Sequence, residues 1–235
     1  MAVTHGVGVN GHYTTVLLPD YRLDTFGVAV GLFDRLELSY ARQAFDTQDV
    51  GTALGLGKGF TFHQNIFGAK LRLIGDAIYD QDQWLPQISA GLQHKENDRG
   101  GVIAAVGGKG AVGTDYYVAA SKLFLAQSLL VNATLRFTKA NQLGILGFGG
   151  GKHDDYAPQF EGSLAYLLSR DLAVGVEGRT TPSNRAIAKE QDAYDVFAAW
   201  FPCKNFSITA AYADLGNIVI KDHQRGAYLS VQAGL

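Results

Sequence analysis

The stretch LLVNATLRFT at residues 129–138 alternates two kinds of side chain along its length. One set of alternate positions is apolar: Leu129, Val131, Ala133, Leu135 and Phe137. From residue 132 onward the positions between them are polar: Asn132, Thr134, Arg136 and Thr138. Successive side chains of a β-strand point to opposite faces of a sheet, so this period of two predicts a strand with one apolar and one polar face.

The same alternation recurs along the chain. Three further apolar faces illustrate it: Phe26, Val28, Val30 and Leu32; Leu172, Val174 and Val176; and Leu229, Val231, Ala233 and Leu235. The 235 residues include 29 glycines and only 5 prolines. This balance favours strands and tight turns, because each interior glycine costs a helix about 1 kcal/mol. We expect an all-β protein of about twelve strands, at residues 11–18, 23–32, 35–44, 61–73, 86–95, 114–124, 128–138, 158–168, 171–180, 191–201, 205–213 and 225–235.

The connections between these strands alternate in length from the second strand onward. The short ones are residues 33–34, 125–127, 169–170 and 202–204, and the long ones are residues 45–60, 96–113, 139–157, 181–190 and 214–224. A transmembrane up-and-down antiparallel β-barrel has this rhythm, with short periplasmic turns, long extracellular loops and an even number of strands. Two connections depart from it, a short one near Tyr21 and a long one at residues 74–85. No run of about 18 or more apolar residues occurs, which excludes a conventional transmembrane helix.

Aromatic residues fall near the expected strand ends, where a membrane barrel carries its two interfacial girdles. The turn-side candidates are Trp84, Tyr166, Trp200 and Phe206, and the loop-side candidates are Tyr40, Tyr117, Phe137 and Tyr212. The alternative is a soluble sandwich or lipocalin-like barrel. A soluble protein turns its polar face to water, whereas here the more polar face carries many Gly, Ala and Ser residues, which suit a confined interior. The membrane barrel is therefore the favoured interpretation.

Composition and motifs exclude several other classes of function. The net charge of −2 provides no basic field for nucleic acid, and the lone Cys203 allows no internal disulfide and no Cys-based zinc site. The GxGxxG match at residues 6–11 lacks the strand before it and the helix after it that a dinucleotide site needs. The six histidines form no known hydrolase motif, and the acidic groups at residues 76–82 and 153–155 are better explained as solvated loops than as Ca²⁺ sites. We expect no catalytic residue, cofactor or metal.

Four segments together resemble a family of Gram-negative outer-membrane proteins of similar length whose function is uncharacterised. They are RLDTFGVAVGLFDRLELS (22–39), IYDQDQWLPQISAGLQ (78–93), TKANQLGILGFGG (138–150) and the stretch from AAWFP (198–202) to TAAYADLGNI (209–218). The resemblance covers nearly the whole chain. It implies an outer-membrane barrel made with a signal peptide, and it carries over no functional residue. The start MAVTHGVGVN shows no such signal, so we expect the printed sequence to be a mature form.

The whole chain, residues 1–235, is expected to form one barrel domain, with a flexible segment at residues 1–10. If the apolar face contacts outer-membrane lipid, the remaining charges point into the lumen. The candidate lumen and solute-binding residues are Lys70, Arg72, Lys122 and Arg136 on one wall, with Lys95 beside them, and Glu161, Glu177, Arg179 and Asp195 on the adjoining wall. Glu37 lies beside the basic group. Clusters of charged side chains are how pores select ions.

Three hypotheses follow from this arrangement. The first is a porin-like channel for small hydrophilic solutes, with anions drawn by the basic wall. The second is a closed structural barrel, in which the charges pair across the lumen and the loops, especially residues 139–157, bind a partner. The third is an outer-membrane enzyme. A barrel of about twelve strands lies between small barrels filled by side chains and large ones with an aqueous channel, so size does not decide among them. The pattern also leaves the oligomeric state open.

Overall fold

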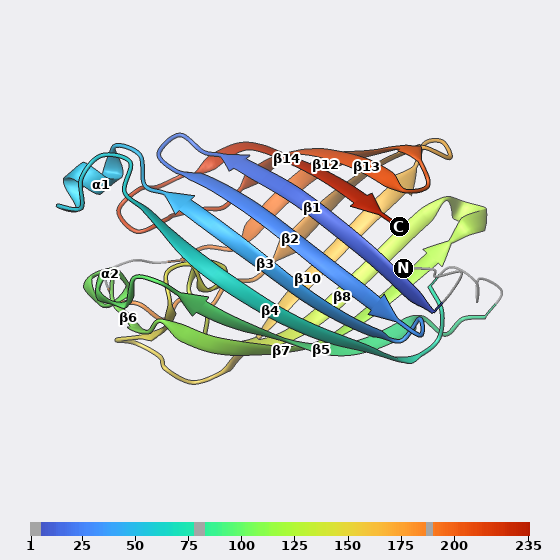
Figure 1. Cartoon of the computed structure of the whole chain (residues 1–235), viewed down its shortest axis with the longest axis horizontal. Coiled ribbons are helices and arrows are strands. Elements are labelled where there is room, and N and C mark those ends of the chain that lie inside the picture. Colours follow the sequence, from blue (N-terminus) through green and yellow to red (C-terminus); the bar gives the residue numbers. More distant parts are fainter. Residues whose placement is uncertain (1–5, 78–82, 187–189) are drawn as a thin grey trace.

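The computed structural model describes residues 6–77, 83–186 and 190–235. Within these residues, twelve antiparallel strands close into a barrel (Figure 1). Their bounds are β1 Val7–Leu17, β2 Arg22–Leu32, β3 Leu36–Asp46, β4 Thr61–Ile74, β5 Gln87–Asn97, β7 Val112–Phe124, β8 Leu129–Thr138, β10 Ala157–Leu167, β11 Leu172–Arg179, β12 Ala193–Cys203, β13 Phe206–Asp214 and β14 Arg225–Gly234. Each strand pairs with its neighbours along the chain, and β14 pairs with β1 to close the ring. The up-and-down topology predicted from the connections is confirmed.

The largest difference from the predicted strand bounds lies at the start of β1. This strand begins at Val7, where Val7 pairs with Leu32 of β2, and Asn10 pairs with Gly234 of β14. Residues 7–10, expected to be flexible, are therefore strand, because they are hydrogen-bonded into the closed ring. Residues 1–5 lie outside the described part of the chain.

The outside of the barrel is apolar and the inside is small or polar, the reverse of a soluble β-protein. Bulky outward side chains are more than half exposed: Phe26 at 57%, Phe160 at 64%, Val196 at 62% and Tyr212 at 63%. A lipid-facing band has this character, because hydrocarbon replaces water as the solvent. One predicted girdle residue is wrong. Tyr117 faces inward, where the Arg136 guanidinium lies 5.1 Å from the centre of its ring.

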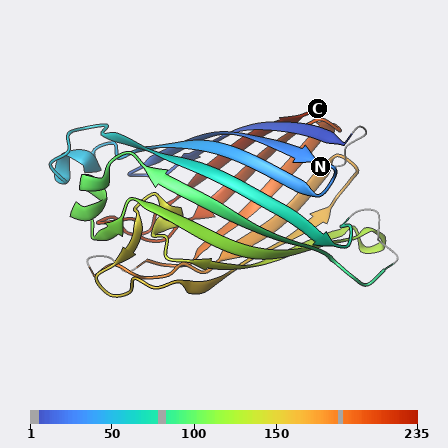
Figure 2. The same ribbon diagram turned by 60° about the horizontal axis from the view of Figure 1, so that its bottom comes forward.

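The two ends of the barrel differ in structure (Figure 2). The tight turns lie at the end that carries both termini, and the long loops lie at the other. Short elements occur in the connections: α1 Val50–Ala53, α2 Gly100–Ala105, β6 Gly108–Gly110, η1 Leu125–Gln127, η2 Gln142–Gly144 and β9 Phe148–Gly150. No helix in the described residues is long and apolar enough to span a membrane. β6 and β9 join two of the long loops in a small sheet of their own.

The short connection between β1 and β2 has a structural reason. Tyr21 turns into the loop end of the barrel, where it is 1% exposed and stacks on Phe45 with ring centres 5.1 Å apart. Its hydroxyl donates a hydrogen bond of 2.9 Å to the Ile218 carbonyl. Burial raises the pKa of Tyr21, so the hydroxyl remains protonated and available as this donor. A longer loop is not needed, because this end is already covered by packing.

Glycines on the inner face let rings from neighbouring strands lie flat against the wall. The His12 ring lies over Gly27, the Tyr117 ring over Gly91 and the Phe197 ring over Gly175; a Cβ at any of these glycines would meet the ring at 2.2 to 2.5 Å. Such distances are below van der Waals contact, so any larger residue would displace the ring toward the axis. The glycine content of the inner face therefore preserves free space in the lumen.

Candidate functional site

The loop between β8 and β10 folds into the end of the barrel instead of extending away from it. We call residues 139–150 the mouth segment. Ile145 and Leu146 of this segment are 4% and 2% exposed, and they belong to one buried apolar cluster with Phe45, Phe62 and Ile218. Apolar packing therefore closes the loop end of the lumen in this structure.

Polar contacts fasten the tip of the mouth segment to the inner wall. The Lys95 ammonium donates a hydrogen bond of 2.9 Å to the Leu143 carbonyl, and the Asn97 amide donates one of 2.8 Å to the Gly144 carbonyl. Lys95 and Asn97 both project inward from β5. The wall of the barrel thus supplies donors to backbone carbonyls that would otherwise be buried without partners.

A second loop, at residues 180–192, locks the mouth segment from the outer side. Arg185 and Glu190 form an ion pair at 2.8 Å with no exposed side-chain surface on either partner. The same Glu190 carboxylate accepts a hydrogen bond from the backbone N–H of Gln142 at 3.1 Å, and the Asn184 amide donates one of 3.2 Å to the Asn141 side chain. The seal therefore depends on two loops that are remote in sequence.

The tip of the mouth segment has an unfavourable backbone. Gln142 and Leu143 have φ of +45° and +63°, in the left-handed region that costs non-glycine residues free energy. The Leu143 side chain is 36% exposed although it lies inside the barrel. It lines three cavities of about 440, 40 and 20 Å³, and Arg179 is the other residue common to all three. Leu143 and Arg179 therefore divide the free space of the lumen.

Most of the basic charge beneath the mouth segment is neutralised along the wall. Lys95 pairs with Asp115 at 2.7 Å, and Arg136 holds Glu161 through two hydrogen bonds of 2.7 and 3.0 Å. Arg136 also lies 3.8 Å from Asp115. These pairs join neighbouring strands and do not cross the lumen. The separate basic and acidic walls expected from the sequence are in fact interleaved at this level.

Lys70 and Arg72 project inward from β4, as expected, but they lie toward the turn end and away from the other charges. Arg72 forms ion pairs with Asp34 at 2.6 Å and with Asp76 at 2.5 Å. Lys70 is the direct register partner of Glu37 on β3. The expected constriction of basic and acidic side chains is therefore split between two levels of the barrel.

The predicted inward position of Lys122 is wrong. Its register partner on β8 is Val131, an outward residue, whereas the preceding Ser121 accepts a hydrogen bond of 2.7 Å from inward-facing Asn132. Lys122 is nevertheless 5% exposed, because its ammonium donates to the backbone carbonyls of Gln83 and Leu85. The long connection after β4 therefore covers this part of the outer surface, which explains its departure from a tight turn.

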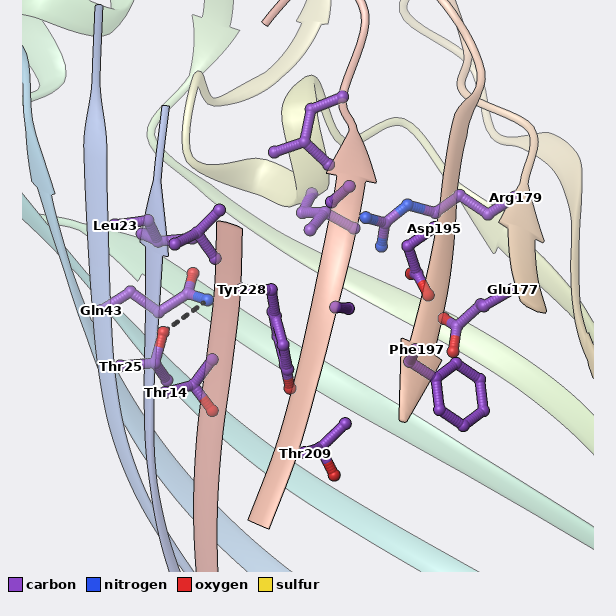
Figure 3. A pocket seen from close by; sticks show the side chains of 15 residues that line it. Thr14, Leu23, Thr25, Gln43, Glu177, Arg179, Asp195, Phe197, Thr209 and Tyr228 are labelled. Atoms are coloured by element: carbon purple, nitrogen blue, oxygen red, sulfur yellow. Dashed lines mark hydrogen bonds between the residues drawn. The ribbon is translucent and has the colours of Figure 1, made fainter. Parts of the chain in front are cut away.

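The remaining candidates, Glu177, Arg179 and Asp195, border a cavity inside the barrel. It has a volume of about 440 Å³, and Gln43 and Tyr228 contribute to its other side (Figure 3). Glu177 and Asp195 are direct register partners on β11 and β12. Figure 3 shows the Arg179 side chain extending toward the cavity above Asp195. This group is the part of the predicted site that the structure brings together around free space.

Two important residues were missed in the sequence. Asp115 pairs with Lys95, and Leu143 divides the lumen. Period-two alternation offered a signal for the first, because Asp115 and Lys122 lie an odd number of residues apart on one strand and cannot share a face. The neighbouring pairs Tyr116-Tyr117 and Ala119-Ala120 interrupt the alternation, so the sequence does not show which residues of this strand face inward. No local pattern indicated Leu143, since its position depends on a loop folding back into the barrel.

The acidic loop groups show no metal site in the described residues. No group of three or more candidate ligands comes together in residues 6–77, 83–186 and 190–235. Asp154 instead contacts Lys109 at 3.1 Å and Lys139 at 3.6 Å, and the hydrogen bond from Lys109 lowers the pKa of its carboxyl group. Asp76 pairs with Arg72, while Asp80 and Asp82 lie outside the described residues.

One hydroxyl, imidazole and carboxylate arrangement occurs on the outer surface. His94 Nδ1 lies 2.9 Å from the Thr114 hydroxyl, and its Nε2 lies 3.3 Å from Glu96. Acyl transfer also needs donors for a developing oxyanion, commonly backbone N–H groups. No such pair of free donors is seen beside His94 among the described residues, and the strands that carry His94 and Thr114 are paired on both sides. The arrangement is therefore explained as a polar contact near the loop end of the barrel.

A closed antiparallel barrel with an apolar exterior and a polar, charged interior defines the chain as an outer-membrane β-barrel. The chain belongs to the family described as "Protein of unknown function (DUF3034)", whose profile matches residues 2–232. No curated protein matches the chain in sequence.

Solved structures share its fold at low sequence identity. The KdgM porin in complex with disordered oligogalacturonate has a TM-score of 0.58 at 12% identity, over 95% of this chain and 98% of that one. The COG4313 outer membrane channel from Pseudomonas putida F1 has a TM-score of 0.56 at 12% identity, over 100% and 97%. Outer membrane phospholipase A from Escherichia coli has a TM-score of 0.50 at 10% identity, over 96% and 92%. The fold thus serves channels and an enzyme.

Proposed function

We propose that the protein is a porin-like channel for small hydrophilic solutes, and that the mouth segment controls their passage. The observation that carries this proposal is the cavity of about 440 Å³ inside the barrel, bordered by charged and hydroxyl side chains and by Leu143. The shared fold with the KdgM porin and the COG4313 channel supports it.

The energetics of the mouth segment are consistent with movement. Burying Ile145 and Leu146 contributes roughly 1.5–3 kcal/mol each. Left-handed backbone at Gln142 and Leu143 costs about 1–3 kcal/mol at each position, which offsets much of that gain. The remaining stability comes from hydrogen bonds worth about 1 kcal/mol apiece. The strained positions lower the free energy needed to displace the segment, which favours exchange between seated and displaced states.

The lumen charges give little support to the anion preference expected from the sequence. That expectation rested on Lys70, Arg72, Lys122 and Arg136. Asp34 and Asp76 pair with Arg72, Glu161 pairs with Arg136, and Lys70 lies opposite Glu37. Lys122 lies outside the lumen. We therefore propose a channel with weak charge selectivity.

A closed barrel whose loops bind a partner remains the second candidate, and the observation that favours it is the apolar seal formed by Ile145, Leu146 and the cluster around them. Planar-bilayer conductance and liposome swelling separate the two. We expect the purified protein to conduct with frequent closures and to admit small uncharged sugars, because the mouth segment must move for each opening. Absence of conductance and swelling from folded protein, both intact and with the mouth segment shortened, would establish the closed barrel.

Gly27→Ala should lower this conductance by narrowing the lumen. The new Cβ would fall 2.2 Å from the His12 ring, which must then turn toward the axis. Gly11→Ala is the matched control, because its Cβ on the adjacent strand would meet nothing closer than the Gly27 carbonyl at 3.9 Å. Adding His12→Ala to Gly27→Ala should restore the conductance. Equal conductance for the two glycine variants would show that the inner wall does not limit flow.

A further inference from the structure

Three charged groups on one side of the cavity of about 440 Å³ interact only at longer range: Arg179 lies opposite Glu161 on the neighbouring strand and is attracted by Glu161, Glu177 and Asp195. Glu177, Arg179 and Asp195 form no hydrogen bond or ion pair with any residue in the described part of the chain. Like charges directly opposite one another on neighbouring strands are destabilising. Glu177 and Asp195 are such a pair. This arrangement has a cost that a solute with complementary charges would relieve.

An unpartnered acceptor lies on the other side of the cavity. The Gln43 side-chain oxygen is buried and has no hydrogen-bond partner, while its amide donates to the Thr25 hydroxyl at 3.3 Å (Figure 3). β3 and β11 lie on opposite sides of the barrel, so Gln43 faces the charged group across the lumen. A buried acceptor left unpaired costs free energy. This observation is independent of the three charges.

The cavity also offers apolar contact. Phe197 lies flat on the wall beside Glu177, and Leu143 is among the apolar residues that line the cavity. Ligand sites of this kind combine apolar surface with a few convergent polar groups, in volumes of about 300–1,000 Å³. The cavity of about 440 Å³ falls within that range.

We propose that this cavity is a binding site for a small zwitterion of the amino-acid type with an apolar side chain. Its ammonium group lies between Glu177 and Asp195, its carboxylate meets the Arg179 guanidinium, and its side chain packs on Phe197. A simple anion would face two carboxylates for one guanidinium, and a simple cation would bring no acceptor to the Arg179 guanidinium. The inference rests on the proposed function, since the solute reaches the cavity through the lumen.

Equilibrium binding to the folded protein in detergent micelles tests the charge pattern without requiring flux. Isothermal titration with phenylalanine, phenethylamine and 3-phenylpropionate compares a zwitterion, a cation and an anion that share one ring. We expect phenylalanine to bind about tenfold or more tightly than either other probe, since each charge-assisted contact contributes about that factor. Equal or tighter binding of a singly charged probe overturns the proposal.

Single substitutions test which residue of the cavity contacts which charged group of the ligand. Arg179→Gln should weaken phenylalanine about tenfold and leave phenethylamine no weaker, whereas Glu177→Gln should weaken phenylalanine and leave 3-phenylpropionate no weaker. Glu37→Gln is the matched control, because Glu37 is an inward carboxylate outside this cavity. Identical behaviour of all three variants overturns the site. If the protein conducts but does not bind phenylalanine, the binding site is refuted and the channel is not. If it binds phenylalanine more tightly than phenethylamine and 3-phenylpropionate but never conducts, the channel is refuted and the binding site is supported.

Discussion

Shortening the mouth segment should raise single-channel conductance several-fold. The variant replaces residues 142–147 with a short glycine-serine linker, which removes Leu143 from the lumen and Ile145 and Leu146 from the seal. The flanking strands should remain in place, because β8 and β10 are paired from Ala157 with Thr138 downward, independently of the segment. Open time should increase together with conductance, since no element has to be displaced for solute to enter.

The control for that variant is an exposed loop that follows α1. Residues 55–58 follow α1, and an added Cβ at Gly55 or Gly57 would meet nothing within 4 Å. Replacing these residues with the same linker should leave conductance unchanged. Heat-modifiable migration on a detergent gel would show that both variants are folded. If the two variants conduct alike, the mouth segment is not the barrier, and the closure seen here has no bearing on transport.

Glu190→Gln should loosen the same seal from the other side, with the second large effect. It leaves the Arg185 guanidinium fully buried without its carboxylate, a situation that costs about 3–5 kcal/mol in other buried pairs. That cost falls on the contacts that join the two loops, because Glu190 also accepts from the Gln142 N–H, so we expect local release of the two loops while the strands stay closed. Limited proteolysis should cut the loops much faster than in the unmodified protein, and conductance should rise.

A double variant separates the lost charge from lost packing. Replacing Arg185 and Glu190 together by methionine removes both charges and retains apolar volume, which is often neutral or stabilising for buried pairs. We expect this variant to be cleaved more slowly than Glu190→Gln. Asp49→Asn removes an exposed pair with Lys58, where both side chains are more than three-quarters exposed, and should change little. Equal cleavage of Glu190→Gln and the double variant would show that the buried charge is not what matters.

The barrel itself could be predicted because its determinants are local. The alternation in residues 129–138 and its repeats specify strands by the geometry of the backbone, and the short and long connections specify how they pair. The alternation alone was enough to predict that residues such as Arg136, Glu161 and Glu177 face the lumen. The alternation gave the wrong face for Lys122. The pairs Tyr116-Tyr117 and Ala119-Ala120 interrupt the pattern, so either set of alternate residues could face inward. The pairing of Lys122 with Val131 and of Ser121 with Asn132 shows that Lys122 belongs to the outward set.

The state of the lumen depends on contacts that no local pattern contains. Leu143 occupies the lumen because Lys95 and Asn97 hold the carbonyls of a loop more than forty residues away, and because Arg185 and Glu190 fasten that loop from outside. The sequence by itself determined an outer-membrane barrel with a polar interior. The tertiary structure decided that its mouth is sealed and its charges mostly paired, since closure and pairing arise from long-range packing whereas strand alternation arises from the backbone of each segment.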